Sequence, residues 1–161
     1  MTNLLAFQIL LCTSLLAGCA STEVTRTSAS TMIVDVSAAP ACGGTGASRV
    51  AQSMVAVETI RAGYDSFIIM SGASANNVKI TQLPGQYNTT GTVNTYGNYG
   101  TYNSTTTYTP GPTIVSGSHD KSLSVKMFRK GERGSEDAVD ARLLLGPDWY
   151  DITVKGIRTC L

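Results

Sequence analysis

One candidate site for chemistry in this chain is a glycine-rich loop, whose residue types and spacing could bind a ligand. Gly43-Gly44-Thr45-Gly46 stands between a segment of strand composition and a segment of helix composition. Backbone amides at such a position can hold a phosphate group. The loop lacks the lysine that ends a Walker loop, and Arg49 stands where the dinucleotide fingerprint needs a third glycine. The pattern therefore predicts a plain helix-entry loop, and a small-molecule or phosphate-binding module stays open as an alternative.

A second candidate is the pair His119-Asp120, which could form half of a Ser-His-Asp arrangement. No G-x-S-x-G elbow accompanies it, so we expect His119 to be a turn residue exposed to water. Glu58 and Arg61 have the spacing of a surface pair on one helix. Two acids that hydrolyse a glycan would have to face one another across a cleft, which spacing does not reveal. We therefore assign no catalytic residue and expect no enzyme, with a cell-wall or glycan hydrolase as the alternative.

A third reactive group is the thiol of Cys19. The run Leu16-Ala17-Gly18-Cys19 closes an apolar stretch that begins at Leu4 and has the pattern of a lipobox, the cleavage and lipidation signal of bacterial lipoproteins. The stretch is shorter than the about 20 residues that a spanning helix needs, and it has no polar face, unlike a short core helix. We expect residues 1–18 to be removed as a signal peptide and Cys19 to be acylated, which anchors the chain stably to a membrane.

The remaining cysteines follow from this expectation. Cys12 leaves with the signal, so Cys42 and Cys160 are the one unmodified pair in an oxidising compartment, and they predict a disulfide. Closing so long a loop would stabilise the fold by about 4 to 5 kcal/mol in the chain-entropy model. A metal site that adds His119 is the weaker alternative, because no C-x-x-C or H-x-x-x-H spacing would hold it. We expect neither a metal nor a cofactor.

The balance of charge argues against a nucleic-acid partner. The chain has 161 residues, with 12 Lys and Arg, 11 Asp and Glu and a net charge of +1. A polyphosphate requires a basic patch, and the one local cluster is formed by Lys126, Arg129, Lys130 and Arg133. Charge runs usually mark solvated surfaces, so we interpret this cluster as a strand end and turn that face water. The length fits one domain.

These residues need a framework, and the patterns predict an α/β (α+β) domain over residues 31–161, preceded by a flexible Ser/Thr-rich tether at 19–30. β-branched and alternating residues predict strands, and apolar stripes with capping residues predict two main helices. The strands are expected at 31–37, 64–70, 77–83 and 122–128, and the helices at 47–62 and 135–145. Residues 149–161 fit a strand or a short helix. We expect two layers, a mixed sheet and a β-α-β unit.

A low-complexity insert at about 84–112 interrupts this domain. No Asp, Glu, Lys or Arg lies between Ile80 and Ser118, and the segment is built from Tyr, Thr, Asn and Gly. Such residues favour extended structure but cannot bury a core, so we expect a long β-hairpin or disorder. A segment of this kind is also prone to strand pairing with other chains. The candidate partner-binding residues are its tyrosines, Tyr87, Tyr96, Tyr99, Tyr102 and Tyr108.

Four segments together resemble a known group of proteins. These are Gly63-Tyr-Asp-Ser-Phe-Ile-Ile, Asn76-Asn-Val-Lys-Ile-Thr-Gln, Pro110-Gly-Pro-Thr-Ile-Val-Ser-Gly-Ser-His-Asp and Asp140-Ala-Arg-Leu-Leu-Leu-Gly-Pro-Asp-Trp149. The chain resembles small uncharacterised lipoproteins of alphaproteobacteria, of rhizobial type. The resemblance implies a Gram-negative envelope setting and one small α/β domain that carries a variable Tyr/Gly/Thr-rich insert. It provides no catalytic or binding residues to transfer.

We therefore expect a lipid-anchored envelope protein with a structural or interaction role. Its partners would be the membrane, through the lipid, and an envelope protein or polysaccharide, through the exposed tyrosines. Ala20 follows the acylated residue in place of the aspartate that retains enteric lipoproteins in the inner membrane. We expect the outer membrane, with the domain facing the periplasm.

Overall fold

The computed structural model describes residues 20–157, 159 and 160. The predicted signal peptide (1–18) and Cys19 lie outside these residues. The described chain is a mixed α+β protein, as predicted, and it divides into two compact units. The core unit comprises the described residues up to Val78 and from Gly117 onward, and the ribbon unit comprises Lys79–Ser116.

The core unit contains β1 (Ala20–Arg26), β2 (Thr31–Ala38), η1 (Pro40–Cys42), α2 (Gly43–Arg61), β3 (Ser66–Asn76), β8 (His119–Phe128), β9 (Val139–Asp140), α3 (Ala141–Leu145) and α4 (Trp149–Lys155). The ribbon unit contains β4 (Lys79–Gln82), β5 (Gln86–Tyr96), β6 (Tyr99–Thr109) and β7 (Thr113–Ser116).

The core unit is built on one sheet with the strand order β1-β2-β8-β3-β9. All of its neighbouring strands pair antiparallel, so the mixed sheet that we expected is wrong. β2 and β3 do run parallel to each other on either side of α2 in the sequence, as a β-α-β unit requires. β8, which follows both strands in the sequence, lies between them in the sheet and pairs with both.

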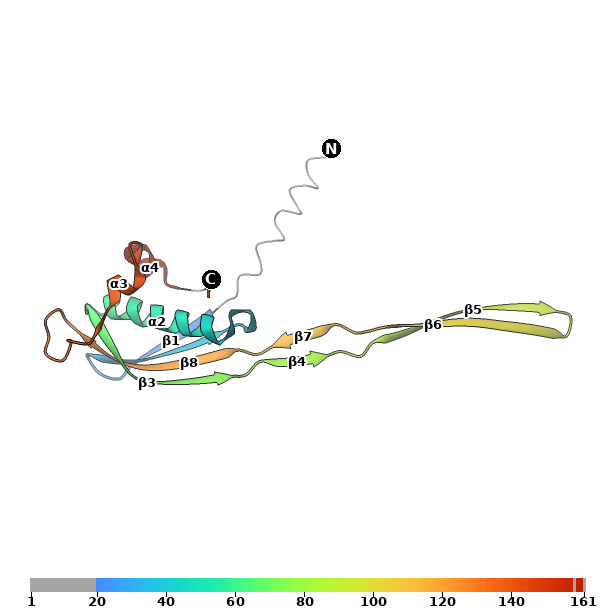
Figure 1. The fold of residues 1–161 in the computed structure, drawn as a ribbon, viewed down its shortest axis with the longest axis horizontal. Helices are drawn as coiled ribbons and strands as arrows, with labels where there is room; N and C mark the ends of the chain where they lie inside the picture. The colour runs from blue at the N-terminus through green and yellow to red at the C-terminus, as the bar shows by residue number, and fades with distance from the viewer. Residues whose placement is uncertain (1–19, 158, 161) are drawn as a thin grey trace, which may run out of the picture. The chain divides into compact units, whose positions relative to one another are not determined.

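Helix α2 covers one face of this sheet (Figure 1). Alternate residues of β2 are buried, as expected for a strand with one covered face. They meet an apolar stripe of α2 that includes Val50, Met54 and Val55. The buried cluster is formed by Met32, Val34, Val36, Val50, Ala51, Met54, Val55, Ala56, Phe67, Val125, Met127 and Ala141. The sequence placed the centre of this helix correctly.

The C-terminal part differs from the expected helix at 135–145. The helix α3 spans Ala141–Leu145, and β9 precedes it in a short pairing with β3. Asp140 caps the helix by accepting a hydrogen bond from the backbone N of Leu143 at 2.9 Å. Ser135 instead donates its backbone N–H to the carbonyl of Glu132 in a turn. The acid before Ala141 therefore acts as the N-cap that the sequence analysis assigned to Ser135.

Residues 149–155 form the helix α4, which resolves the ambiguity of the C-terminal segment. Arg61 holds α4 to α2, because its Nε and Nη2 donate to the carbonyl of Thr153 at 2.9 and 2.6 Å. The predicted surface pair is confirmed, since Arg61 also contacts Glu58 at 2.7 Å. Among the described residues, no helix is both long and apolar enough to cross a membrane.

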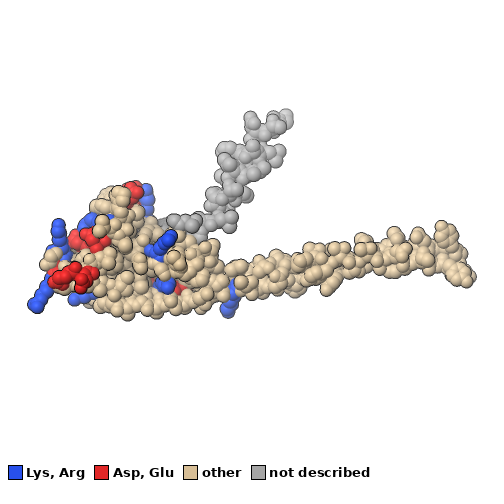
Figure 2. Space-filling model, viewed as in Figure 1, with Lys and Arg blue, Asp and Glu red and all other residues tan. Residues whose placement is uncertain are grey.

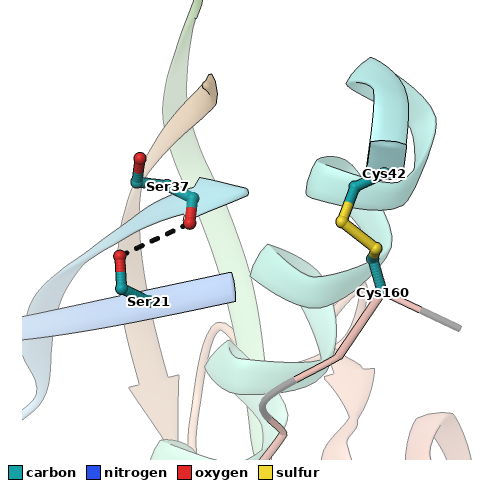
Figure 3. The surroundings of a disulfide bond; sticks show 4 residues. All are labelled: Ser21, Ser37, Cys42 and Cys160. Carbon is teal, nitrogen blue, oxygen red and sulfur yellow. Dashed lines mark hydrogen bonds between the residues drawn. A yellow bond between two sulfur atoms is a disulfide. The ribbon is translucent and has the colours of Figure 1, made fainter. Parts of the chain in front are cut away.

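The disulfide joins the entry of α2 to the end of the described chain (Figure 3). Cys42 and Cys160 are bonded, with their Cα atoms 5.6 Å apart and with a separation of 118 positions in sequence. The pairing that the sequence predicted is therefore present in the structure. It fastens the C-terminal segment to the helix that covers the sheet.

We expected a flexible tether at 19–30, and this prediction is wrong for residues 20–26. Residues 20–26 form the edge strand β1, which pairs along its full length with β2. Its sequence carries little apolar surface, so no local pattern indicated a strand. The free edge of β2 supplies the hydrogen-bond partners that a polar segment needs to become a strand.

Candidate interaction surface

The candidate site is the hairpin formed by β5 and β6 in the ribbon unit, which we call the tyrosine hairpin (86–109). Its strands pair without a register shift from Gln86 opposite Thr109 to Tyr96 opposite Tyr99. Gly97 has a φ of 57°, and a glycine at the first position of a two-residue loop is typical of a tight type II′ hairpin turn. The structure therefore favours the hairpin over the disorder that the sequence left open.

One face of the tyrosine hairpin carries Tyr87, Val93, Tyr102 and Tyr108, because cross-strand partners share a face. The rings of Tyr87 and Tyr108 pack with centroids 4.7 Å apart. Tyr102 lies over Gly91, where a Cβ would come within 2.6 Å of its ring. Tyr108 covers Gly85 in the same way. These contacts use part of the aromatic surface to stabilise the hairpin itself.

The opposite face is a ladder of small polar residues. Its cross-strand pairs are Asn88 with Thr107, Thr90 with Thr105, Thr92 with Asn103 and Asn94 with Thr101. The pair Tyr96 and Tyr99 ends this face beside the turn, and these two rings are 84% and 85% exposed. They are the most exposed of the tyrosines that the sequence singled out. The hairpin thus presents its least engaged aromatic rings at its tip.

Charge distinguishes the hairpin from the rest of the protein. Figure 2 shows Lys, Arg, Asp and Glu side chains over the core unit and none along the tyrosine hairpin. The second pair of strands in the ribbon unit, β4 and β7, adds exposed aliphatic groups at Ile80, Ile114 and Val115. Lys79 is the one charged residue of this unit, so a partner of the unit would otherwise meet aromatic, aliphatic and neutral polar groups.

The core unit has one notable surface of its own, which sequence reasoning missed. The sheet face away from α2 bears a depression of about 520 Å³, lined largely by small residues of β1, β2, β3 and β8. The alternation of Asp35 and Ser37 in β2 with Asp120 and Ser122 in β8 could have indicated a polar face. Glu23 and Asp35 lie directly opposite one another there. Like charges so placed weaken the strand pairing.

Asp120 ties this face together. Its Oδ1 accepts from the Ser37 hydroxyl at 2.7 Å and its Oδ2 from the Asn77 amide at 2.6 Å. The hydroxyls of Ser37 and Ser118, followed by the Asn77 amide, hold the pKa of this carboxyl below its ordinary value. An ionised carboxylate with both oxygens engaged suits a structural junction better than a proton donor.

His119 and Asp120 do not act on one site. They are adjacent in β8, and adjacent strand residues point to opposite faces of a sheet. Asp120 takes its hydrogen bonds from Ser37 and Asn77 on the open face, while His119 belongs to the face that α2 covers. His119 lies in a strand and is half-buried, so the exposed turn position that the sequence predicted for it is wrong.

The glycine-rich loop is explained by packing. α2 begins at Gly43, and Gly46 lies against the disulfide, where a Cβ would come within 3.2 Å of the Cβ atoms of Cys42 and Cys160. Gly46 therefore makes room for the disulfide at the first turn of the helix. Within residues 20–157, 159 and 160, no three His, Cys, Asp or Glu side chains gather as metal ligands would.

In comparisons with known proteins, no family model, no curated protein and no solved structure matched the chain. The resemblance to small alphaproteobacterial lipoproteins therefore stays a prediction from sequence.

Proposed function

We propose that this protein is an interaction protein of the bacterial envelope, in which the tyrosine hairpin binds another protein. The observation that carries the proposal is the pair Tyr96 and Tyr99, which are 84% and 85% exposed on either side of a tight turn. Tyrosines provide binding energy at low entropic cost, since each ring offers apolar area and a hydroxyl with few rotatable bonds. Two such rings at a hairpin tip suit insertion into a pocket of a partner.

The neutral surface of the hairpin specifies the kind of recognition. No charged residue lies between Ile80 and Ser118, so association does not depend on long-range attraction. Binding through aromatic and hydrogen-bonding groups changes little with ionic strength, because salt screens only charges. We expect capture of the partner to be similar in low and in high salt.

The proposal includes a membrane anchor. The lipobox that ends at Cys19 supports acylation, and β1 starts at the next residue, which would leave no spacer between the lipid and the folded core unit. The absence of an aspartate after Cys19 favours the outer membrane. Fatty-acid labelling tests the anchor, since label is expected in the wild type and not in Cys19→Ser. Unlabelled wild-type protein would overturn it.

The test of the binding proposal is the double variant Tyr96→Ser, Tyr99→Ser. Tyr150 on α4 is 65% exposed in the core unit, and Tyr150→Ser is the matched control for loss of an exposed tyrosine. After crosslinking in intact cells, one protein should be recovered at least tenfold less with the double variant and equally with the control. Equal recovery of every crosslinked protein from all three chains would overturn the proposal.

A second variant replaces residues 84–112 by Gly-Ser-Gly-Ser, which joins β4 to β7 through a short loop. Because the described residues of the hairpin are exposed and the loop length enters stability only logarithmically, the melting temperature should stay within about 5 °C of the wild type. The same variant should lose the crosslinked partner. A large loss of cooperative melting would show that the hairpin stabilises the core unit.

A further inference from the structure

The outer edge of β6 is an unused strand-pairing surface. A two-residue loop makes its flanking residues a hydrogen-bonded pair, so Tyr96 and Tyr99 bond to each other and the pattern alternates from there. The alternate residues of β6, from Gly100 to Tyr108, therefore turn their N–H and C=O groups outward. Among the described strands, none pairs with this edge, because the sheet contains β5 and β6 alone.

Edge strands of natural proteins usually carry features that prevent pairing with other chains, and this edge has none of them. The usual protective features are charged side chains, prolines and bulges. Residues 86–109 contain no charged residue and no proline, and their register is continuous. An unguarded edge eleven residues long is a template for another strand.

The composition of β6 favours this edge over that of β5. Threonine and tyrosine occupy eight of the eleven positions of β6, and both residue types favour strands. In β5 these two types occupy six of the eleven positions, and the strand contains Gly91 and two asparagines, whereas β6 contains one glycine and one asparagine; glycine and asparagine weaken a strand. Both strands have an unpaired outer edge, and β6 is the better strand former for a further strand to extend.

We propose that two copies of this chain pair through β6, antiparallel and two-fold symmetric about Ser104; this rests on the proposed function, since it assigns one partner to the same hairpin. The symmetric register places Gly100 opposite Tyr108 of the second copy. It also places Tyr102 opposite Thr106, and Ser104 opposite itself. All of these residues have outward-facing backbone groups, so about ten hydrogen bonds form between the copies.

A second copy fits this edge for three reasons. The two edges are identical and uncharged, so no electrostatic repulsion opposes their approach. The symmetric register continues the threonine face from one hairpin to the next, with Thr101 opposite Thr107 and Asn103 opposite Thr105. An isolated two-stranded hairpin is only marginally stable in water. Pairing of two copies makes a four-stranded sheet, which is more stable and needs no other element of the chain.

The test uses a matched pair of proline variants. Thr89 and Thr106 face each other across the hairpin with their hydroxyls 2.9 Å apart, and both turn their backbone N–H outward. Thr106→Pro and Thr89→Pro therefore remove the same side-chain contact, and they differ in the edge that loses its donor. The full chain in detergent solution is measured by sedimentation equilibrium, with circular dichroism to compare strand content.

The wild type and Thr89→Pro should be dimeric, and Thr106→Pro should raise the dissociation constant at least tenfold. A wild type that is monomeric at about 100 µM, or equal weakening by both prolines, would overturn pairing through β6. The outcome is separable from that of the binding proposal. A monomeric chain that still loses its crosslinked partner with Tyr96→Ser, Tyr99→Ser would contradict self-pairing and leave the binding proposal in place.

Discussion

The sheets of the core unit and the ribbon unit are both antiparallel, yet their strands bury very different amounts of surface. Alternate residues of β2 are buried beneath α2, whereas every residue of β5 and β6 is exposed. Threonine, tyrosine and backbone pairing are enough to form the hairpin, while the free energy that holds the fold together comes from the covered sheet. The comparison separates the part that stabilises the protein from the part that is free to bind.

The largest effect is expected from removal of the disulfide, which tests how much this bond contributes to the stability of the core unit. Replacing Cys42 and Cys160 by serine should lower its free energy of unfolding by about 4 to 5 kcal/mol, because the bond closes a very long loop. Urea unfolding monitored by the fluorescence of Trp149 measures this. The reduced wild type is the control and should match the double variant. A change of less than about 1 kcal/mol would show that packing alone fixes the C-terminal segment.

A smaller effect is expected from single side chains, and here the two units can be compared directly. Phe67 is 2% exposed in the core unit, and Val93 is 64% exposed in the hairpin. Phe67→Ala should cost about 3 to 5 kcal/mol, since it leaves a cavity. Val93→Ala should change stability by less than about 0.5 kcal/mol. Similar losses from both substitutions in thermal melts would contradict the division between the units.

The smallest effect concerns charge within the core unit. Hydrogen bonds from the Arg142 guanidinium, at 2.7 Å, and from the Lys130 backbone N lower the pKa of Asp65 from its ordinary value of 3.8. The contribution is therefore present above pH 3.8 and is lost as the pH falls through the lowered value. Asp65→Asn should cost about 1 kcal/mol at neutral pH, given its partial exposure.

Melting temperatures near neutral pH and well below pH 3.8 check this sign. The difference between wild type and Asp65→Asn should shrink toward zero in acid, because the carboxyl is then protonated in both states. Asp151→Asn is the control, since the contact of Asp151 with Lys155 at 3.1 Å is largely exposed and should matter little. A difference that persists unchanged in acid would mean that Asp65 acts through shape alone.

Much of the fold followed from local patterns in the sequence. The alternation in residues 31–37 and the stripe of Val50, Met54 and Val57 predicted β2 and α2, because period two and period 3.6 are properties of single elements. The uncharged Tyr/Thr/Asn segment is likewise visible in the sequence, because composition is also a local property of the chain. The pairing of Cys42 with Cys160 followed from counting the thiols that remain after the predicted signal.

Other features were decided only by tertiary contacts. β1 is a strand because β2 offers it a free edge, and the antiparallel sheet arises because β8 inserts between β2 and β3. The start of α3 depends on Asp65, whose carbonyl accepts the backbone N–H of Ala141 at 3.0 Å. Periodicity determines which face of an element is apolar, but the partners of its backbone come from distant parts of the chain. Local patterns therefore indicated the strongly periodic elements β2 and α2, whereas β1, the start of α3 and the order of the strands depend on tertiary contacts.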